Sequence, residues 1–298
     1  MCQTNSPEID GHGFHELSLR GEPNNAGFAI IGFEKEGVDY KPSVVGGYLS
    51  AHRSGATLTG TNLVGAQIHL SHAGNPIYSL RIVDVSGAPV WAAGQQEWVP
   101  TYLLEWTTIG TSRWSTLCPR DEKGPWMEAH HSVLFEGDRI DAEKKRVAAQ
   151  PDESWMNIGC TGSTLAKMFL TGHTHASQQH GFVTSRDERQ AMLKMLSGDY
   201  CGGGTPYTVG GTPLDWADHN GWMTYIDKKA VLEARWNQDG AACLNRARIA
   251  ASQYEPGLDV FPDVHASIEA ECSLPACDEP DDKFLGYHLL SANPNQNP

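Results

Sequence analysis

Cysteine usage constrains this 298-residue chain more than any other feature of its sequence. Seven cysteines are present, and setting aside Cys2, which follows the initiator Met, leaves an even set of six. An even set of cysteines is typical of disulfide bonds, which form mainly in oxidising compartments outside the cytoplasm. The sequence therefore predicts a disulfide-stabilised protein with these candidate bonding residues: Cys118, Cys160, Cys201, Cys243, Cys272 and Cys277.

One pairing is suggested by spacing alone. Four residues, including a Pro, separate Cys272 from Cys277, and this spacing lets two Cβ atoms approach bonding distance. The connectivity of the full set stays open, because six cysteines can pair in many ways. A zinc site is the competing interpretation, but the chain has no Cys-x-x-Cys pair and no His within five residues of either cysteine.

The residues after Cys2 suggest how the native protein reaches its compartment. The polar run from Gln3 to Pro7 resembles the start of a mature bacterial lipoprotein whose signal peptide has been replaced by one Met. Cys2 is therefore a candidate lipid anchor, with a terminal thiol of no role as the alternative. The sequence shows no apolar signal-peptide core and no run of about eighteen apolar residues that could span a membrane. We expect an extracytoplasmic protein, either secreted or an outer-surface lipoprotein in its native precursor.

The net charge narrows the range of partners. The chain carries 22 Lys and Arg against 36 Asp and Glu, which gives a formal net charge of −14. A surface of this sign repels phosphate backbones, so the sequence predicts no nucleic-acid partner. It indicates no particular ligand, cofactor or oligomeric state.

The first half of the chain is predicted to be rich in strands. Residues 1–43 form an irregular N-terminal segment with one buried strand at 27–33, and residues 44–117 form a β-rich region. Three quintets fill residues 56–70, with Leu58, Leu63 and Ile68 at their centres. Such a period suits a degenerate pentapeptide-like β repeat, and a strand pair with a chance repeat is the alternative. β-branched and aromatic residues predict further strands at 76–85, 98–109 and 132–136.

Two short helices are predicted within residues 118–250. The first covers 163–170, and the second begins at the capping-box residues Ser185 and Glu188 and runs to about Leu196. The charged run 141–150 is read as a solvated helical turn or loop, and Gly202 to Gly204 as a turn. Residues 251–298 are rich in Pro and acidic residues and read as a tail. The predicted fold class is α+β, mainly β with two short packed helices.

Three segments resemble one bacterial family. The central one spans 189–213 and includes Gly198-Asp199-Tyr200-Cys201; the others are 159–167 around Cys160 and 233–243 around Trp236 and Cys243. Together they resemble the ADYC-domain proteins, a bacterial secreted or lipoprotein family named for an Ala-Asp-Tyr-Cys run, with Gly198 in the place of the Ala. The resemblance supports a compartment and disulfides and implies no activity.

Two departures from the family pattern fall together. The pattern has Cys where this chain has Met168 and Met192. Losing both cysteines is what removal of one disulfide would look like, so we expect the two thioethers to pack in the space of that bond.

Two groups of residues are candidates for chemistry. Cys201 beside Asp199, with a histidine such as His131 brought in by the fold, is a candidate Cys-His nucleophile, and disulfide bonding of Cys201 is the alternative. His173, His175 and His180 are candidate metal ligands, because i, i+2 imidazoles project to the same side of an extended segment. A loop with surface histidines is the alternative to that site.

The function expected from the sequence is that of an extracytoplasmic, disulfide-stabilised surface or binding protein of unknown ligand. A secreted hydrolase or metal-dependent enzyme that uses the histidine cluster or the Cys-His pair is the alternative.

Overall fold

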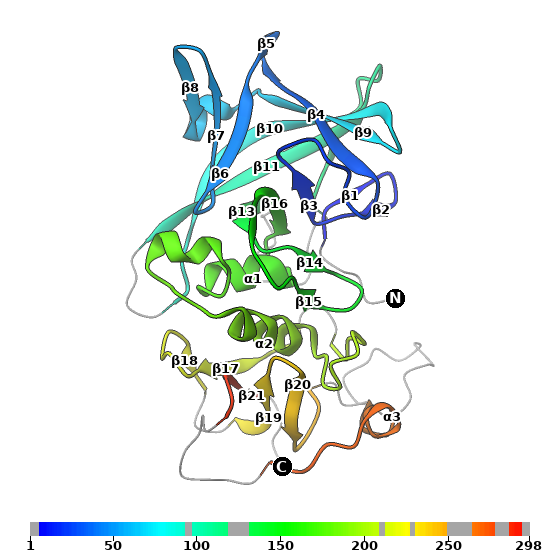
Figure 1. Cartoon of the computed structure of the whole chain (residues 1–298), viewed down its shortest axis with the longest axis vertical. Coiled ribbons are helices and arrows are strands. Elements are labelled where there is room, and N and C mark those ends of the chain that lie inside the picture. The colour runs from blue at the N-terminus through cyan, green and yellow to red at the C-terminus, as the bar shows by residue number, and fades with distance from the viewer. Residues whose placement is uncertain are drawn as a thin grey trace.

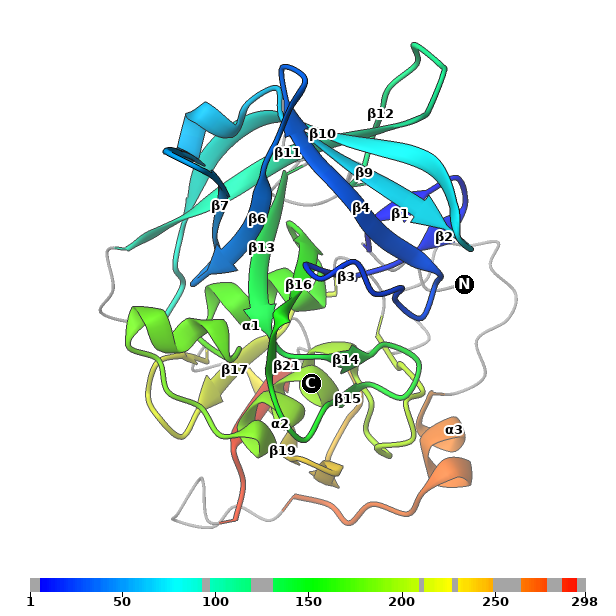
Figure 2. The ribbon, with the colours of Figure 1, turned by 45° about the horizontal axis from the view of Figure 1, so that its top comes forward.

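Two β-sheets lie at opposite ends of the molecule with two helices between them (Figures 1 and 2). The computed structural model describes residues 6–92, 97–118, 131–208, 212–226, 230–248, 264–277 and 286–293. Cys2, the candidate lipid anchor, lies outside these residues. Among the described residues, no helix combines the length and apolar character needed to cross a bilayer.

The larger sheet has nine strands, and its pairings are antiparallel. Its spatial order is β3 (Glu16–Ser18), β16 (Asp152–Cys160), β13 (His131–Gly137), β11 (Trp98–Thr108), β10 (Asn75–Pro89), β9 (Gln67–His72), β4 (Phe28–Lys35) and β5 (Val38–Asp39), with β12 (Ser115–Thr116) beside β11. The strands predicted at 27–33, 76–85, 98–109 and 132–136 are confirmed as β4, β10, β11 and β13.

Smaller sheets complete the β structure. The five-stranded sheet runs β18 (Thr224–Tyr225), β17 (Asp215–Asp218), β21 (Leu289–Asn293), β19 (Val231–Asn237) and β20 (Gly240–Leu244). A three-stranded sheet contains β6 (Lys41–Val45), β7 (Tyr48–Arg53) and β8 (Ala56–Thr59). Two hairpins pair β1 (Glu8–Ile9) with β2 (His12–Gly13) and β14 (Ile140–Asp141) with β15 (Arg146–Val147).

The two predicted helices are confirmed as α1 (Thr164–Leu170) and α2 (Arg186–Ser197). Helix α1 packs on β13 and β16, and α2 packs between α1 and the five-stranded sheet, as Figure 1 shows. Met168 of α1 and Met192 of α2 are both fully buried in one hydrophobic cluster. Two 3-10 turns, η1 (Gly60–Leu63) and η2 (Ala176–His180), and a third helix, α3 (Val264–Glu271), are also formed.

Three disulfide pairs are formed, which confirms the disulfide-stabilised class. Their Cα atoms lie 5.5 Å apart in Cys118–Cys160, 5.7 Å in Cys201–Cys272 and 4.9 Å in Cys243–Cys277. The first pair ties the end of β16 to the chain after β12, while the other two attach the segment around α3 to the chain after α2 and to β20. The expected local pair Cys272–Cys277 is wrong, because each of the two cysteines has a distant partner.

The quintets at 56–70 do not stack as repeats. They fall on β8, η1 and β9, and β8 and β9 belong to different sheets. Gly60 and Gly65, which close the first two quintets, have φ of 52° and 88°, so the chain turns where a solenoid would continue. The alternative of a strand pair is also wrong, because β8 pairs with β7 whereas β9 pairs with β4 and β10.

The charged run at 141–150 is mostly exposed, as expected of a loop, and it contains the turn of the β14–β15 hairpin. Gln190 of α2 holds the second strand, because it accepts from Val147 N and donates to Lys145 O.

The C-terminal segment differs from its expected structure. The segment read as a tail contributes α3 and β21, and β21 pairs with both β17 and β19. The apolar run Leu289–Leu290 is fully buried there, which composition averaged over the whole segment conceals.

The chain after α2 makes a close backbone contact with the β19–β20 hairpin. Ala241 N donates to Tyr200 O at 2.8 Å, and a Cβ on Gly202, whose φ is 74°, would lie 1.8 Å from Asp239 O. A side chain at position 202 therefore forces these two segments apart.

We predict that the purified, oxidised protein has at most one alkylatable thiol under denaturing conditions, that of Cys2. Each of the three loops that the disulfides close stabilises the fold by about 4 kcal/mol in the chain-entropy description, so reduction should lower the unfolding midpoint strongly. Mass spectrometry after alkylation without reductant measures the thiol count. Three or more modified cysteines would remove the disulfide framework and the extracytoplasmic assignment with it.

We also predict that Gly202→Ala destabilises the fold more than Gly221→Ala. Both glycines have left-handed φ, 74° and 75°, so both substitutions incur about 1–2 kcal/mol of backbone strain. Only Gly202 also meets a backbone atom, since nothing lies within 4 Å of a Cβ on Gly221, and overpacking adds about 1–3 kcal/mol. Urea unfolding of the two variants measures the difference, and equal losses would contradict the close contact.

Candidate functional site

Helix α2 supplies most of the wall of the candidate site, and its ends are defined by the local sequence. Ser185 Oγ accepts from Glu188 N while the Glu188 carboxylate accepts from Ser185 N, a complete capping box. Gly198 closes the helix with φ of 64°, a left-handed conformation that Gly adopts without strain. The helix therefore begins and ends at fixed residues and presents a fixed set of side chains.

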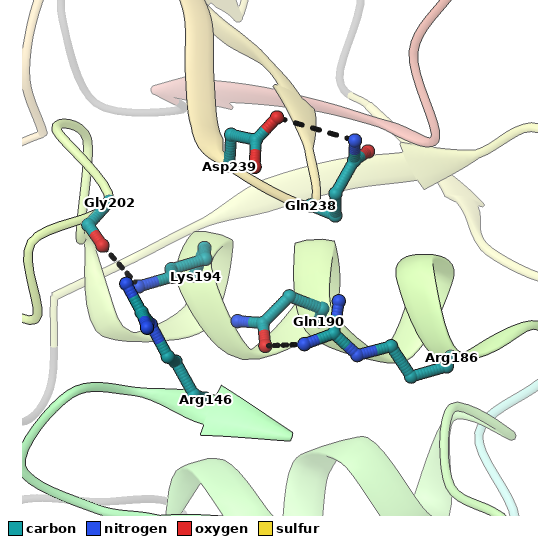
Figure 3. A pocket seen from close by; sticks show the side chains of 7 residues that line it. All are labelled: Arg146, Arg186, Gln190, Lys194, Gly202, Gln238 and Asp239. Carbon is teal, nitrogen blue, oxygen red and sulfur yellow. Dashed lines mark hydrogen bonds between the residues drawn. The ribbon is translucent and has the colours of Figure 1, made fainter. Parts of the chain in front are cut away.

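A pocket of about 250 Å³ lies against α2 (Figure 3). Three residues spaced four apart on one face of the helix line it: Arg186, Gln190 and Lys194. Arg146 of β15 approaches from one side, and Gln238 and Asp239 of the β19–β20 hairpin close the other (Figure 3). The lining is polar and strongly cationic, in a chain whose net charge is −14.

The Lys194 ammonium holds the pocket wall and has no hydrogen left for a ligand. It donates to the Asp199 carboxylate at 2.5 Å, to Gly202 O at 2.8 Å and to Lys144 O at 3.1 Å. Both members of this ion pair are buried, so removing one partner would leave an unpaired charge in the interior. Lys194 therefore fixes the chain on both sides of the pocket.

Gln190 and Arg186 fix the position of Arg146. The Gln190 amide holds residues 145 and 147 on either side of it, and the Arg186 guanidinium donates to Val147 O at 2.9 Å. The Arg146 side chain is exposed and donates no side-chain hydrogen bond within the described chain, and it interacts electrostatically with the carboxylate of Asp141, its cross-strand partner. The backbone of Arg146 is thus fixed beside the pocket, which its side chain lines with its donors available.

This arrangement is suited to an anion. Arg146 and the half-buried Arg186 present guanidinium groups, which bind carboxylate or phosphate oxygens through paired donors, and Arg186 already pairs with the Asp187 carboxylate at 3.1 Å. Across the pocket, Asp239 and Gln238 offer acceptors and an amide to a hydroxyl or amine of the same ligand.

The run Asp199-Tyr200-Cys201 serves structure at all three positions. Asp199 is fully buried and pairs with Lys194, and its carboxylate also accepts from Gly204 N at 2.9 Å. Cys201 is bonded to Cys272, so it has no thiol to act as a nucleophile. His131 lies on β13 in the other sheet, with Nε2 3.4 Å from Asp84 Oδ2. The structure therefore does not bring His131, Asp199 and Cys201 together.

Tyr200 anchors the same run to β19. Its hydroxyl donates to the Glu233 carboxylate, which also accepts from Arg248 Nε at 2.8 Å, and Arg248 N donates to the Tyr200 hydroxyl. Burial, and then the neighbouring Glu233 carboxylate, raise the pKa of Tyr200. The Tyr200 and Trp236 rings also pack 5.1 Å apart, which joins the two resemblance segments 189–213 and 233–243.

The three predicted metal-binding histidines face separate partners. His173 is buried, and Nδ1 hydrogen-bonds to Thr171 O at 2.9 Å. His175 Nε2 lies 3.7 Å from the Glu153 carboxylate, whereas both ring nitrogens of His180 are engaged, one by Glu97 and the other by Gly46 O. In the part of the chain that the structure describes, these residues do not form a group whose ligand atoms converge.

None of the residues that line the pocket was predicted to be functional from the sequence. Arg186, Gln190 and Lys194 follow an i, i+4, i+8 spacing that was available in the sequence, and Gly202, read there as a turn, lines the pocket as well. Arg146 gave no signal, because the charged run around it is typical of a solvated surface.

Comparison with known proteins agrees with the resemblance. A family model described as the ADYC domain matches residues 60–250. No curated protein and no solved structure matches the chain. Because the family match covers more than half of the sequence and includes the Asp199-Tyr200-Cys201 run, the chain belongs to the ADYC domain family.

Proposed function

We propose that this ADYC-domain protein is an extracytoplasmic, disulfide-stabilised binding protein, and that the pocket on α2 binds a small anionic ligand. The observation that carries the proposal is the position of Arg146. Its side chain donates no hydrogen bond to the described residues and lines the polar pocket together with Arg186, with the Asp141 carboxylate as its charged neighbour across the hairpin.

Electrostatics supports an anion over a neutral ligand. Of the cationic groups around the pocket, Arg146 keeps its side-chain donors available, whereas Lys194 pairs with Asp199 and Arg186 pairs with Asp187 at 3.1 Å. The strongly acidic chain repels anions over most of its surface, so an anion is expected to bind only where cationic side chains gather. The ligand therefore carries a carboxylate, phosphate or sulfate group.

The size of the pocket limits the ligand. Its volume of about 250 Å³ is below the roughly 300–1,000 Å³ that is usual for drug-sized ligands. A phosphate, a sulfate or a small di- or tricarboxylate suits this volume, whereas an extended polymer would bind only through a terminal group.

The proposed location rests on the disulfides. Three bonded pairs are consistent with an oxidising compartment, and we propose that the native precursor is secreted or is a lipoprotein anchored through Cys2. The alternative of a secreted hydrolase with a Cys201 nucleophile lacks its thiol while Cys201 is bonded to Cys272.

Calorimetric titration of the full oxidised chain with inorganic phosphate, sulfate and citrate tests the pocket. At least one probe should bind, more weakly at high salt, and Arg146→Ala should weaken that binding by about tenfold or more. A hydrogen bond to a charged group contributes about 1.5–3 kcal/mol, and about 1.4 kcal/mol is a tenfold change. The affinity of Arg146→Lys should lie between those of the wild type and Arg146→Ala, because Lys keeps the charge but loses the paired donors.

Arg113→Ala is the matched control, because Arg113 is also exposed but lies in the loop between β11 and β12. Its affinity for the probe should equal that of the wild type. Binding of none of the three anions, or equal losses in Arg146→Ala and Arg113→Ala, would contradict the proposal.

A further inference from the structure

Two histidines and one glutamate converge at the N-terminal end of α2, apart from the residues that line the pocket. Glu188, His219 and His288 each offer one ligand atom, and these atoms lie within 4.8 Å of one another. Over the described ranges, no other group of three His, Cys, Asp or Glu residues meets this condition. The convergence joins three segments that are far apart in the sequence.

Strand register brings the two histidines together. Asp218 at the end of β17 pairs with Leu289 at the start of β21, so His219 and His288 face each other one step beyond the paired ends. His219 N donates to His288 O at 3.1 Å, which extends the ladder, and the two ring centroids lie 5.7 Å apart. Directly opposed side chains of an antiparallel pair are the closest neighbours that a sheet provides.

The capping box of α2 orients the glutamate. One oxygen of the Glu188 carboxylate accepts from Ser185 N, and the other, Oε1, lies 3.2 Å from His219 Nε2. Asn220 Nδ2 donates to the same Oε1 at 2.9 Å. One carboxylate oxygen is therefore turned toward the histidines by two hydrogen bonds that do not depend on them.

We propose that Glu188, His219 and His288 bind a divalent transition metal of the zinc class. Imidazole nitrogens and a carboxylate oxygen are ligands that zinc accepts, and a set of two His and one Glu leaves a coordination position open. Ligand atoms at about 2.0–2.1 Å from zinc lie about 3.4 Å apart in a tetrahedral arrangement. The present spacing closes to that value by small side-chain rotations, for which the exposed His219 has room.

The turn that carries His219 is held by groups outside the proposed site. The Asp218 carboxylate accepts from Trp222 N and Met223 N, both at 2.9 Å. Residues that orient metal ligands raise affinity because less conformational freedom is lost on binding. The fixed turn and the fixed helix end thus leave the His219 and His288 rings as the parts that must adjust.

The test uses the full, oxidised and untagged chain, stripped of metal with a chelator and titrated with Zn²⁺. We expect one zinc per chain by elemental analysis after dialysis, and a higher unfolding temperature with zinc because the metal binds the folded form. A residue that only orients a ligand changes metal affinity by about 10- to 100-fold, so His219→Ala or His288→Ala should weaken binding by at least about 100-fold. Glu188→Gln should also weaken it, and this variant keeps the capping box because Gln serves at the same position.

His175→Gln is the control, since His175 belongs to the separate histidine loop, and it should bind zinc as the wild type does. Visible absorption of bound Co²⁺ gives a second readout that does not depend on stability, and it should be lost in the three site variants. No stoichiometric zinc in the wild type, or zinc that persists in both histidine variants, would overturn the proposal. Neither result bears on anion binding at Arg146, so the two sites are tested separately.

Discussion

The burial of α2 is the constraint on which the arrangement of the five-stranded sheet and its connecting loops depends. Nine of its twelve residues are buried, and they include Glu188, Arg189, Gln190 and Lys194. Burying a polar group without a hydrogen-bond partner destabilises the fold, so each of these side chains needs a hydrogen-bond partner in a neighbouring segment. Arg189, for example, donates to the Asp138 carboxylate at 2.9 Å and to Thr184 O at 2.7 Å. The loops around the helix are therefore shaped by the helix itself.

The Asp199-Tyr200-Cys201 run, which is typical of the family, fixes the chain after α2. Asp199 neutralises Lys194, Tyr200 joins β19 through Glu233, and Cys201 bonds the helix exit to Cys272. Asp199 and Tyr200 are fully buried and Cys201 is partly buried, so these three residues stabilise the fold around α2 and do not line the pocket. By our two proposals, an anion binds at the face with Arg186 and a metal binds at the helix start with Glu188.

Local sequence signals predicted the elements, and long-range pairing escaped them. The capping box at Ser185 and the strands at 76–85 and 98–109 were found because their signals lie within a few residues. Contacts between distant segments cannot be predicted from spacing along the sequence. They determine the disulfide partners, the place of β21 in the sheet and the proximity of His219 to His288. For the same reason, closeness in the sequence predicts a metal site of His173, His175 and His180, although the fold gives these three side chains separate partners.

Native-state hydrogen exchange of Tyr200→Phe tests the central claim that the Asp199-Tyr200-Cys201 run holds α2 against the five-stranded sheet. The substitution keeps the ring and removes the hydroxyl that joins Glu233. Loss of one partner from a buried polar group costs about 1–3 kcal/mol, so amides of α2 and β19 should exchange about 5- to 150-fold faster. Amides of β9, β10 and β11, which pack in a separate hydrophobic cluster, should keep their rates. Unchanged exchange in α2, or equal acceleration in both sheets, would contradict the account.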